Sequence, residues 1–286
     1  SLDVAVRKES FALALQGQAW MAEWLPPRLQ QALQSGEAIP IGLQARFNRS
    51  SNVLTIQNLQ VNTSLADLQL NGDVDLQEKD LDLQAGLDCG NIQALQPLLP
   101  VPAEGQASLR LKARGGLPSP DIRLTLAASD VAISQIKVPE AELALTTSLP
   151  PSVQDQSVEI SGSGMVSGVL SNSTPLTSGP LDIQFLTSIH PSGVLDIPEL
   201  TITSPAEQIH LSARLDADTS FTTSVSLSLP QLKTQPLLAD SGLAGGFDLD
   251  LDLQGKLDPL SLSAALTAQT DELSGRLEGG RAPQAI

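Results

Sequence analysis

Aromatic residues are nearly absent from this chain of 286 residues, which has five Phe, two Trp and no Tyr. Compact β-sandwiches fill their centres with large rings, so the scarcity argues against a thick, closed core of that kind. Hydrophobic residues still make up 41% of the chain, which argues against disorder. Leu, Val, Ile and Ala must therefore supply the apolar surface, and such a surface suits aliphatic partners.

Basic residues are also scarce. The chain has 16 Lys and Arg against 32 Asp and Glu, which gives a formal net charge of −16, and no Lys/Arg cluster occurs. A negative protein is repelled by phosphate backbones and by anionic lipid surfaces. The composition therefore predicts no nucleic-acid partner.

The residues of catalytic and metal sites are sparse. The single Cys89 excludes an intrachain disulfide framework and a CxxC metal site, and no stretch of about 18 apolar residues could form a membrane-spanning helix. No Gly-rich phosphate loop, nucleophile elbow or HExxH motif is present. We therefore expect no enzyme, no catalytic residue, no metal site and no cofactor.

The isolated candidates favour structural roles. His190 precedes Pro191 in a turn segment, and His210 falls on a polar position that we expect to face solvent. Cys89 continues a row of apolar positions, so we expect an apolar-facing thiol at a strand end. Two distant His and one Cys cannot form a metal cluster without carboxylates.

Two further patterns resemble binding motifs only superficially. The segment GSGMVSG (162–168) lacks the GxGxxG spacing followed by a helix, and a hairpin or bulge is the better interpretation. Asp248, Asp250 and Asp252 would align on one strand face, but a flat row converges poorly on calcium. We expect a solvated acidic face there.

Leucine alternates with polar residues along most of the chain. The clearest segments are LQLNGDVDL (68–76), LDLQAGL (81–87), SLRLKAR (108–114) and FDLDLDL (247–253). Successive side chains of a strand point to opposite faces, so each segment would have one apolar and one polar face. The pattern predicts an all-β protein.

Turn residues separate the alternating segments at short intervals, as in NRSSN (48–52), QEKD (77–80), IHPSG (189–193) and GKLDP (255–259). Connections of about four to six residues suit antiparallel hairpins, because parallel crossovers need a dozen or more. We expect roughly twenty strands in an antiparallel arrangement, with boundaries uncertain by a few residues.

A helical pattern occurs only near the start. Segment 18–36, QAWMAEWLPPRLQQALQSG, places Trp20, Met21, Trp24 and Leu25 at helical spacing, and its two prolines could open a second turn. A short helical pair that caps a sheet edge is one interpretation. A helix that binds a membrane surface or a partner is the other, although the segment is not basic.

The chain also resembles itself at an offset of about 141 residues. Residues 53–76 align with 194–216, and GNIQALQPLLP (90–100) aligns with SLPQLKTQPLLAD (228–240). The strand-turn-strand segments that follow also align. Repeats with one apolar face cannot bury it alone, so we expect them to stack into an elongated, curled sheet.

This alignment suggests a division of the chain. We expect strands and a short helical cap element in 1–36, a first groove repeat in 37–145, Gly/Ser/Pro-rich strands and a connection in 146–180, and a second groove repeat in 181–280. The opening SLDVAV and the loop-like EGGRAPQAI suggest a piece of a longer protein.

The repeated blocks resemble the TamB branch of the AsmA-like repeating β-groove proteins, also called bridge-like lipid transfer proteins. The similarity is carried by GNIQALQPLLP with the following GQASLRLKARGGLPSPDI, and by LPQLKTQPLLADSGLAGGFDLDLDLQGKLDPL. A short Leu/Pro element is followed by a Gly-led strand and a Gly-x-Leu-x-x-Pro turn. Gly115, Leu117 and Pro120 match that turn, and Gly255, Leu257 and Pro259 match it loosely, with one residue fewer before the proline.

The resemblance implies a long, taco-like β-sheet with a hydrophobic concave face. It implies a periplasmic segment of a protein anchored in the inner membrane of a diderm bacterium. Phospholipid acyl chains would be its partners, on their way to the outer membrane. An outer-membrane barrel of the Omp85 type would be a further partner through parts absent from this chain.

The apolar positions of the strands are the candidate binding residues. A continuous exposed row of such side chains is untenable unless something covers it. The candidates for a lipid-binding groove face are Leu68, Leu70, Val74, Leu76, Leu81, Leu83, Leu87, Leu109, Leu111, Ile122, Leu124, Leu126, Leu249, Leu251 and Leu253.

Other interpretations of the same rows remain open. The halves of the sheet could close on each other as a dry core. The groove or its edges could hold strands of an outer-membrane protein during assembly. A secreted β-helical stalk is a third alternative, although β-helices show a shorter and stricter repeat.

Overall fold

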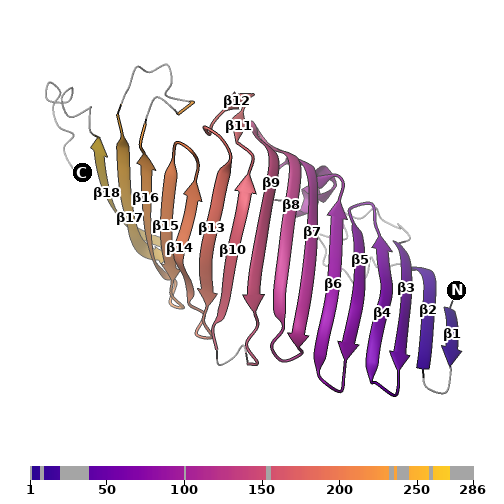
Figure 1. Ribbon diagram of the computed structural model, residues 1–286. Coiled ribbons are helices and arrows are strands. Elements are labelled where there is room, and N and C mark those ends of the chain that lie inside the picture. Colours follow the sequence, from indigo (N-terminus) through magenta and orange to yellow (C-terminus); the bar gives the residue numbers. More distant parts are fainter. Residues whose placement is uncertain are drawn as a thin grey trace, which may run out of the picture. The chain divides into compact units, whose positions relative to one another are not determined.

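The computed structural model describes residues 2–6, 10–19, 39–99, 101–152, 156–231, 235–236, 245–257 and 260–270. The chain divides into two compact units, Ser1–Val158 (unit 1) and Glu159–Ile286 (unit 2). Antiparallel β-strands dominate both units (Figure 1), and the all-β prediction is confirmed. The helical element expected over 18–36 lies outside the described residues, except that Gln18 and Ala19 end a strand.

Unit 1 is a meander in which each strand pairs antiparallel with the next along the chain. A 3-10 helix, η1 (Ile92–Leu98), follows the sixth strand. The strands are β1 (Leu2–Val6), β2 (Ser10–Ala19), β3 (Ile39–Asn48), β4 (Val53–Asn62), β5 (Asp67–Asp75), β6 (Asp80–Cys89), β7 (Ala103–Gly116), β8 (Asp121–Ile133) and β9 (Ile136–Ser148).

Unit 2 has the same antiparallel organisation. Its first strand pairs with β13, and from β13 onward each strand pairs with its successor. The strands are β10 (Val158–Val166, which starts at the unit boundary), β11 (Leu170–Ser171), β12 (Thr174–Pro175), β13 (Leu181–Ile189), β14 (Leu195–Thr203), β15 (Gln208–Leu215), β16 (Ser220–Leu229), β17 (Phe247–Leu257) and β18 (Leu260–Thr270).

Short polar turns join many of these strands, as the sequence predicts. The segment NRSSN forms the β3–β4 turn, where the Asn48 side chain accepts hydrogen bonds from the Ser50 N–H (3.0 Å) and hydroxyl (2.7 Å). His190 lies in the β13–β14 turn, where its N–H donates to the Val194 carbonyl at 2.8 Å. The glycine-rich segment is part strand and part turn, because Gly162 and Gly164 lie inside strand β10 and Gly168, with a φ of +152°, lies in the connection to β11.

Two hairpins, one in each unit, contain a β-bulge that the alternation of leucines did not predict. In β4 the register shifts between Ile56 and Leu59, and in β14 it shifts between Ile197 and Leu200. Each shift places one extra residue in the strand, which is a β-bulge. The bulge keeps both flanking apolar residues on the same face although they are three positions apart.

Burial is low throughout the described residues. No large side chain is fully buried among them. The buried hydrophobic residues are Ile39, Leu65, Cys89, Ala103, Val158 and Ala206. Neither unit, over its described residues, therefore contains a closed dry core of its own. No helix among these residues is long and apolar enough to cross a membrane.

Candidate functional site

Strand register joins the leucines of unit 1 into continuous cross-strand rows. In an antiparallel pair, residues directly opposite each other lie on the same face with Cβ atoms about 5 Å apart. The central row is Leu15, Leu43, Leu59, Leu70, Ala85, Leu111, Leu124 and Leu145. A second row is Ile41, Val61, Leu68, Leu87, Leu109, Leu126 and Leu143. We call the face that carries these two rows the unit 1 apolar face.

Nearly all of the predicted groove residues of unit 1 lie on this face. They fall on β5, β6, β7 and β8, and the register brings them together as neighbours. Leu76 is the exception, because β5 ends at Asp75 and Leu76 lies in the following turn, 54% exposed. Its N–H donates to the Asn52 carbonyl at 3.0 Å.

Unit 2 carries an equivalent arrangement, which contains the predicted Leu249, Leu251 and Leu253. One row is Phe185, Leu200, Leu211, Val225, Leu251 and Leu266, and the next is Ile183, Ile202, Ile209, Leu227, Leu249 and Ala268. We call this surface the unit 2 apolar face. Leu253 lies in a third row, between Thr223 and Ala264.

The rows are half-covered by their own neighbours and otherwise open. Leu87 is 38% exposed and Leu126 is 37% exposed, although both lie within the second row of unit 1. Leu266 at the margin of unit 2 is 64% exposed. Contiguous apolar surface of this kind marks an interaction site in a soluble protein. The arrangement can shelter an aliphatic chain, and the two named rows of each unit carry no polar side chain to orient one.

Sequence reasoning missed many members of these faces. Leu59 and Val61 of β4 went unnoticed because the bulge breaks the two-residue alternation in VLTIQNLQV. Leu43 of β3 and Leu145 of β9 had the signal, since each lies two positions from another apolar residue, but their segments contain fewer leucines. A search for rows across strands would have found them.

The opposite face of unit 1 is polar and has an unfavourable arrangement of charge. Asp73 lies directly opposite Asp82, and like charges in that position destabilise a strand pair. Arg114 Nε lies 2.9 Å from Asp82 Oδ1, and Arg110 Nη2 lies 2.7 Å from Asp88 Oδ1. Arg114 offsets the repulsion between Asp73 and Asp82, and Arg110 offsets that between Asp88 and Asp67, which also lie opposite each other. Each exposed ion pair contributes at most about 1 kcal/mol.

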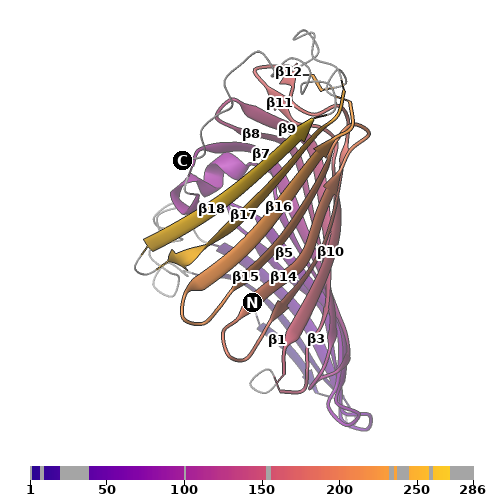
Figure 2. The ribbon, with the colours of Figure 1, turned by 90° about the vertical axis from the view of Figure 1, so that its left-hand side faces the viewer.

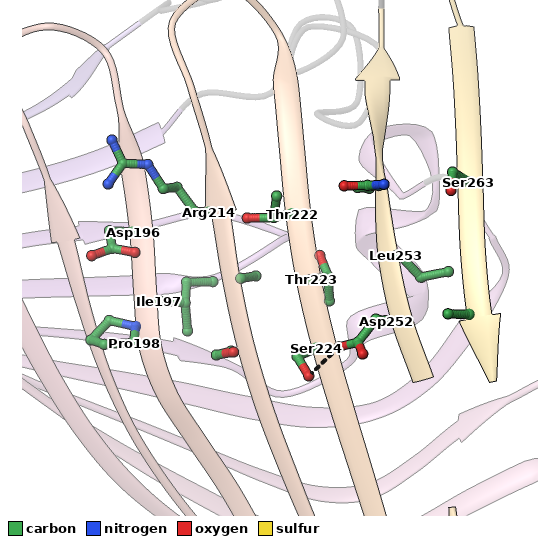
Figure 3. Close-up of a pocket in the computed structure, with 14 residues that line it drawn as sticks. Asp196, Ile197, Pro198, Arg214, Thr222, Thr223, Ser224, Asp252, Leu253 and Ser263 are labelled. Carbon is green, nitrogen blue, oxygen red and sulfur yellow. Dashed lines mark hydrogen bonds between the residues drawn. The ribbon is translucent and has the colours of Figure 1, made fainter. Parts of the chain in front are cut away.

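A shallow hollow of about 400 Å³ lies over β14–β18 of unit 2 (Figure 3). Its lining includes one cross-strand row of the polar face, Arg214, Thr222, Gln254 and Ser263, and the adjacent row of Ile197, Ala213, Thr223 and Leu253. The Ser224 hydroxyl donates to Asp252 Oδ1 at 2.7 Å within it. The lining therefore mixes polar and apolar residues.

The remaining candidates take the places that the sequence predicts. His210 is exposed, and its Nδ1 lies 3.1 Å from the Thr201 hydroxyl. Cys89 ends β6 and is buried. Asp248, Asp250 and Asp252 are exposed along one face of β17. Within the described part of the chain, no three His, Cys, Asp or Glu residues come together as a metal site.

The fold and the surface define the class of this protein: each unit is an open antiparallel β-sheet with one aliphatic face and one polar face. No protein-family model, curated protein or solved structure matches the chain.

Proposed function

We propose that this chain is a segment of a non-enzymatic hydrophobic β-groove that shields phospholipid acyl chains during transport across the periplasm to the outer membrane. The observation that carries the proposal is the continuity of the apolar rows, which cross β2–β9 in unit 1 and β13–β18 in unit 2 and stay partly exposed. A conduit needs such continuity more than it needs any one strong site.

The chemistry of the two faces supports an aliphatic cargo. The rows consist mainly of Leu, Ile, Val and Ala, with few aromatic rings and without charged side chains. A leucine transferred from water to an apolar contact gains about 1.5–3 kcal/mol. A bound acyl chain would provide that contact along the whole row while the polar face remains in water.

The dimensions also suit an acyl chain. With strands about 4.8 Å apart, the eight strands β2–β9 extend over about 34 Å. The apolar positions of β6, from Leu81 to Cys89, extend over about 26 Å along the strand. Half the hydrocarbon thickness of a bilayer is about 15 Å. The face of unit 1 is therefore large enough for several acyl chains.

The similarity between the two bulged hairpins supports a sheet built from repeats. Thr63 Oγ1 accepts from the Ala66 N–H at 2.9 Å, and Ser204 Oγ accepts from the Glu207 N–H at 3.1 Å. Both hydroxyls therefore close the same kind of turn at the end of a bulged hairpin. We include in the proposal a periplasmic position, an inner-membrane anchor and relationship to the TamB branch of AsmA-like proteins.

Site-specific photo-crosslinking in a diderm host tests the proposal. A photoreactive amino acid at Leu70, Leu111 or Leu251 should yield phospholipid adducts, which mass spectrometry detects. The same probe at Asp73 or Asp250 should not, because these residues are on the polar faces. Asp250 and Leu251 form a matched pair, since they are adjacent in β17 and point to opposite faces.

The outcomes separate the proposal from its rivals. Equal lipid labelling at the leucines and the aspartates, or none at either, would contradict the conduit. Adducts with outer-membrane proteins in place of lipid would favour a module that assists the assembly of those proteins. An Omp85-type barrel partner would appear as a protein adduct in the same experiment.

A further inference from the structure

Strand register brings two basic residues of unit 1 together on its polar face. Lys112 of β7 lies directly opposite Arg123 of β8, a relation in which Cβ atoms are about 5 Å apart. Both side chains are exposed. The sequence contains no run of basic residues, and these two meet only because β7 and β8 pair. We call Lys112 and Arg123 the basic pair.

The polar face of unit 1 is open at the basic pair. In η1, Ala94 and Leu95 pack against the cluster of Ile39 and Leu65, beside Ile41 of the unit 1 apolar face. Figure 2 shows η1 lying to one side of the unit 1 strands, beside β7. Because η1 covers the apolar side of the sheet, it leaves the polar side of β7 and β8 accessible to solvent.

The basic pair has no ion-pair partner within the described part of the chain. The cations on either side of Lys112 in β7 differ in this respect. Arg110 forms an ion pair with Asp88, and Arg114 forms one with Asp82. The charges of these two arginines are therefore compensated by β6, whereas those of the basic pair are not.

A nearby carboxylate of β8 does not compensate the pair either. Asp121 lies two positions from Arg123 on the same face, and it accepts a hydrogen bond from the Ser148 hydroxyl. It forms no ion pair with either member of the basic pair. Like charges directly opposite each other destabilise a strand pair. A bound anion would remove this repulsion.

The rest of the cross-strand row supplies hydrogen-bond donors and no carboxylate. The row is Asn71, Gln84, Lys112, Arg123 and Thr146. Its amide and hydroxyl groups can all donate to an anion. In unit 2, the row at the same position relative to the bulge is Ser212, Ser224, Asp252 and Ala265, which contains a carboxylate and no cation. The cationic row is therefore a feature of unit 1 alone among these two matched rows.

We propose that the basic pair binds a phosphate group, either free or carried by a phosphorylated ligand. An arginine fork and a lysine ammonium both form charge-assisted hydrogen bonds with phosphate oxygens. A phosphate monoester carries a charge of about −1.5 to −2 at pH 7, which matches two cations better than the single charge of a carboxylate does. Gln84 and Thr146, on either side of the pair, would donate to the remaining oxygens. The site is on the face opposite the apolar rows, so it does not depend on the proposed function.

Two-dimensional NMR of the whole chain, titrated with inorganic phosphate, tests the site. Sodium chloride at equal ionic strength is the reference, because salt alone changes surface electrostatics. We expect saturable shifts of the backbone N–H signals around Lys112 and Arg123. Lys112→Gln and Arg123→Gln should each weaken binding by about fivefold or more, since each removes a charge-assisted hydrogen bond. Lys112→Arg, which keeps the charge, should retain binding.

Arg46→Gln is the matched control. Arg46 is an exposed cation on the polar face of β3, and it lies opposite Ala12 and Thr55, so it has no second cation across the strands. The variant removes one positive charge and should leave the phosphate affinity unchanged. Shifts that do not saturate, that spread over the basic residues of both units, or that persist unchanged in Lys112→Gln and Arg123→Gln would overturn the proposal.

Thermal unfolding gives an independent readout. An anion that binds the folded chain raises its melting temperature. Phosphate also stabilises proteins without a site, because it is excluded from their surfaces, so the decisive quantity is the difference between the unaltered chain and Arg123→Gln. The unaltered chain should gain more from phosphate than Arg123→Gln does. Equal gains in the two chains would contradict the site.

Vesicles distinguish a lipid phosphate from a soluble one. Sedimentation of the chain with phosphatidylcholine vesicles is compared in the presence and absence of phosphatidic acid. Capture by phosphatidic acid that Arg123→Gln abolishes would assign the site to a lipid phosphate. Binding of inorganic phosphate without such capture would assign it to a soluble phosphorylated ligand, the result that the net charge of −16 favours.

Discussion

The β4–β5 hairpin of unit 1 and the β14–β15 hairpin of unit 2 reach the same backbone geometry with different side chains. Both have a bulge after an isoleucine, Ile56 in one and Ile197 in the other. Both close with a hydroxyl that caps the turn, and both bury a residue inside that turn, Leu65 or Ala206. The backbone arrangement is therefore the common feature of the two hairpins.

The means of covering the turn differ between the units. In unit 1, Leu65 is covered by apolar contact with η1 through Ala94 and Leu95. In unit 2, the small Ala206 is accompanied by the buried Gln235, whose Nε2 donates to the Ala206 carbonyl at 3.0 Å. A large apolar side chain in one unit is thus replaced by a small one and a hydrogen bond in the other. The β4–β5 turn and the β14–β15 turn are therefore covered by different kinds of contact.

The largest expected difference between the hairpins concerns the residue opposite the bulge. Gly72 pairs with Ile56 and has a φ of +139°, whereas Ala213 occupies the matching position opposite Ile197. A Cβ on Gly72 would meet the Asp82 carbonyl oxygen at 2.1 Å. We expect Gly72→Ala to lower the free energy of unfolding by about 3 kcal/mol or more.

Urea unfolding followed by circular dichroism measures this effect. Ala213→Gly is the matched control, and it should cost only about 0.5–1 kcal/mol through backbone entropy. Equal losses in the two variants would show that the hairpins do not differ in the way their backbones approach the next strand.

A smaller difference is expected from the residues that cover the turns. Leu65→Ala removes apolar contacts beneath η1 and should cost about 2–3 kcal/mol. Gln235→Ala leaves the Ala206 carbonyl without this donor and should cost about 1–2 kcal/mol. The same unfolding experiment compares them. A larger loss of unfolding free energy from Gln235→Ala than from Leu65→Ala would mean that the hydrogen bond stabilises its turn more than the apolar contacts stabilise theirs.

The alternation of leucines was enough to predict the fold class and most of one apolar face. The reason is physical, because side-chain direction in a strand depends only on the parity of the position. The prediction stopped where parity fails: at the β4 bulge, which conceals Leu59, and at the end of β5, which excludes Leu76. Bulges and strand ends depend on the neighbouring strand, so a single segment does not reveal them.

The packing of η1 against the β4–β5 turn could not be predicted from the sequence. GNIQALQPLLP is recognisable as a recurring Leu/Pro element, yet nothing in it shows that Ala94 and Leu95 pack against residues some 30 to 55 positions earlier, Leu65 and Ile39. Contacts of that kind arise from the register of the whole meander. The predicted acidic row on β17 needed no such information, and its side chains are exposed as expected.

The smallest expected effect distinguishes the turns that follow the two hairpins. In the β15–β16 turn, the Ser220 hydroxyl donates to Asp218 Oδ1 at 2.5 Å, and this hydrogen bond is the main cause that lowers the pKa of Asp218 below 3.8. In the β5–β6 turn, the hydrogen bonds that Asp75 accepts from described residues are those of the backbone N–H groups of Gln77 and Glu78. A lowered pKa means that the folded state prefers the carboxylate, so its contribution to stability is present above the ordinary pKa and is lost as the pH falls through the lowered value.

Ser220→Ala should move the NMR titration midpoint of Asp218 upward, toward the ordinary value, while Ser220→Thr, which keeps a hydroxyl, should leave it low. An unchanged midpoint in Ser220→Ala would assign the shift to the backbone N–H of residue 220 and to Lys256 instead, and the two turns would then stabilise their carboxylates in the same way.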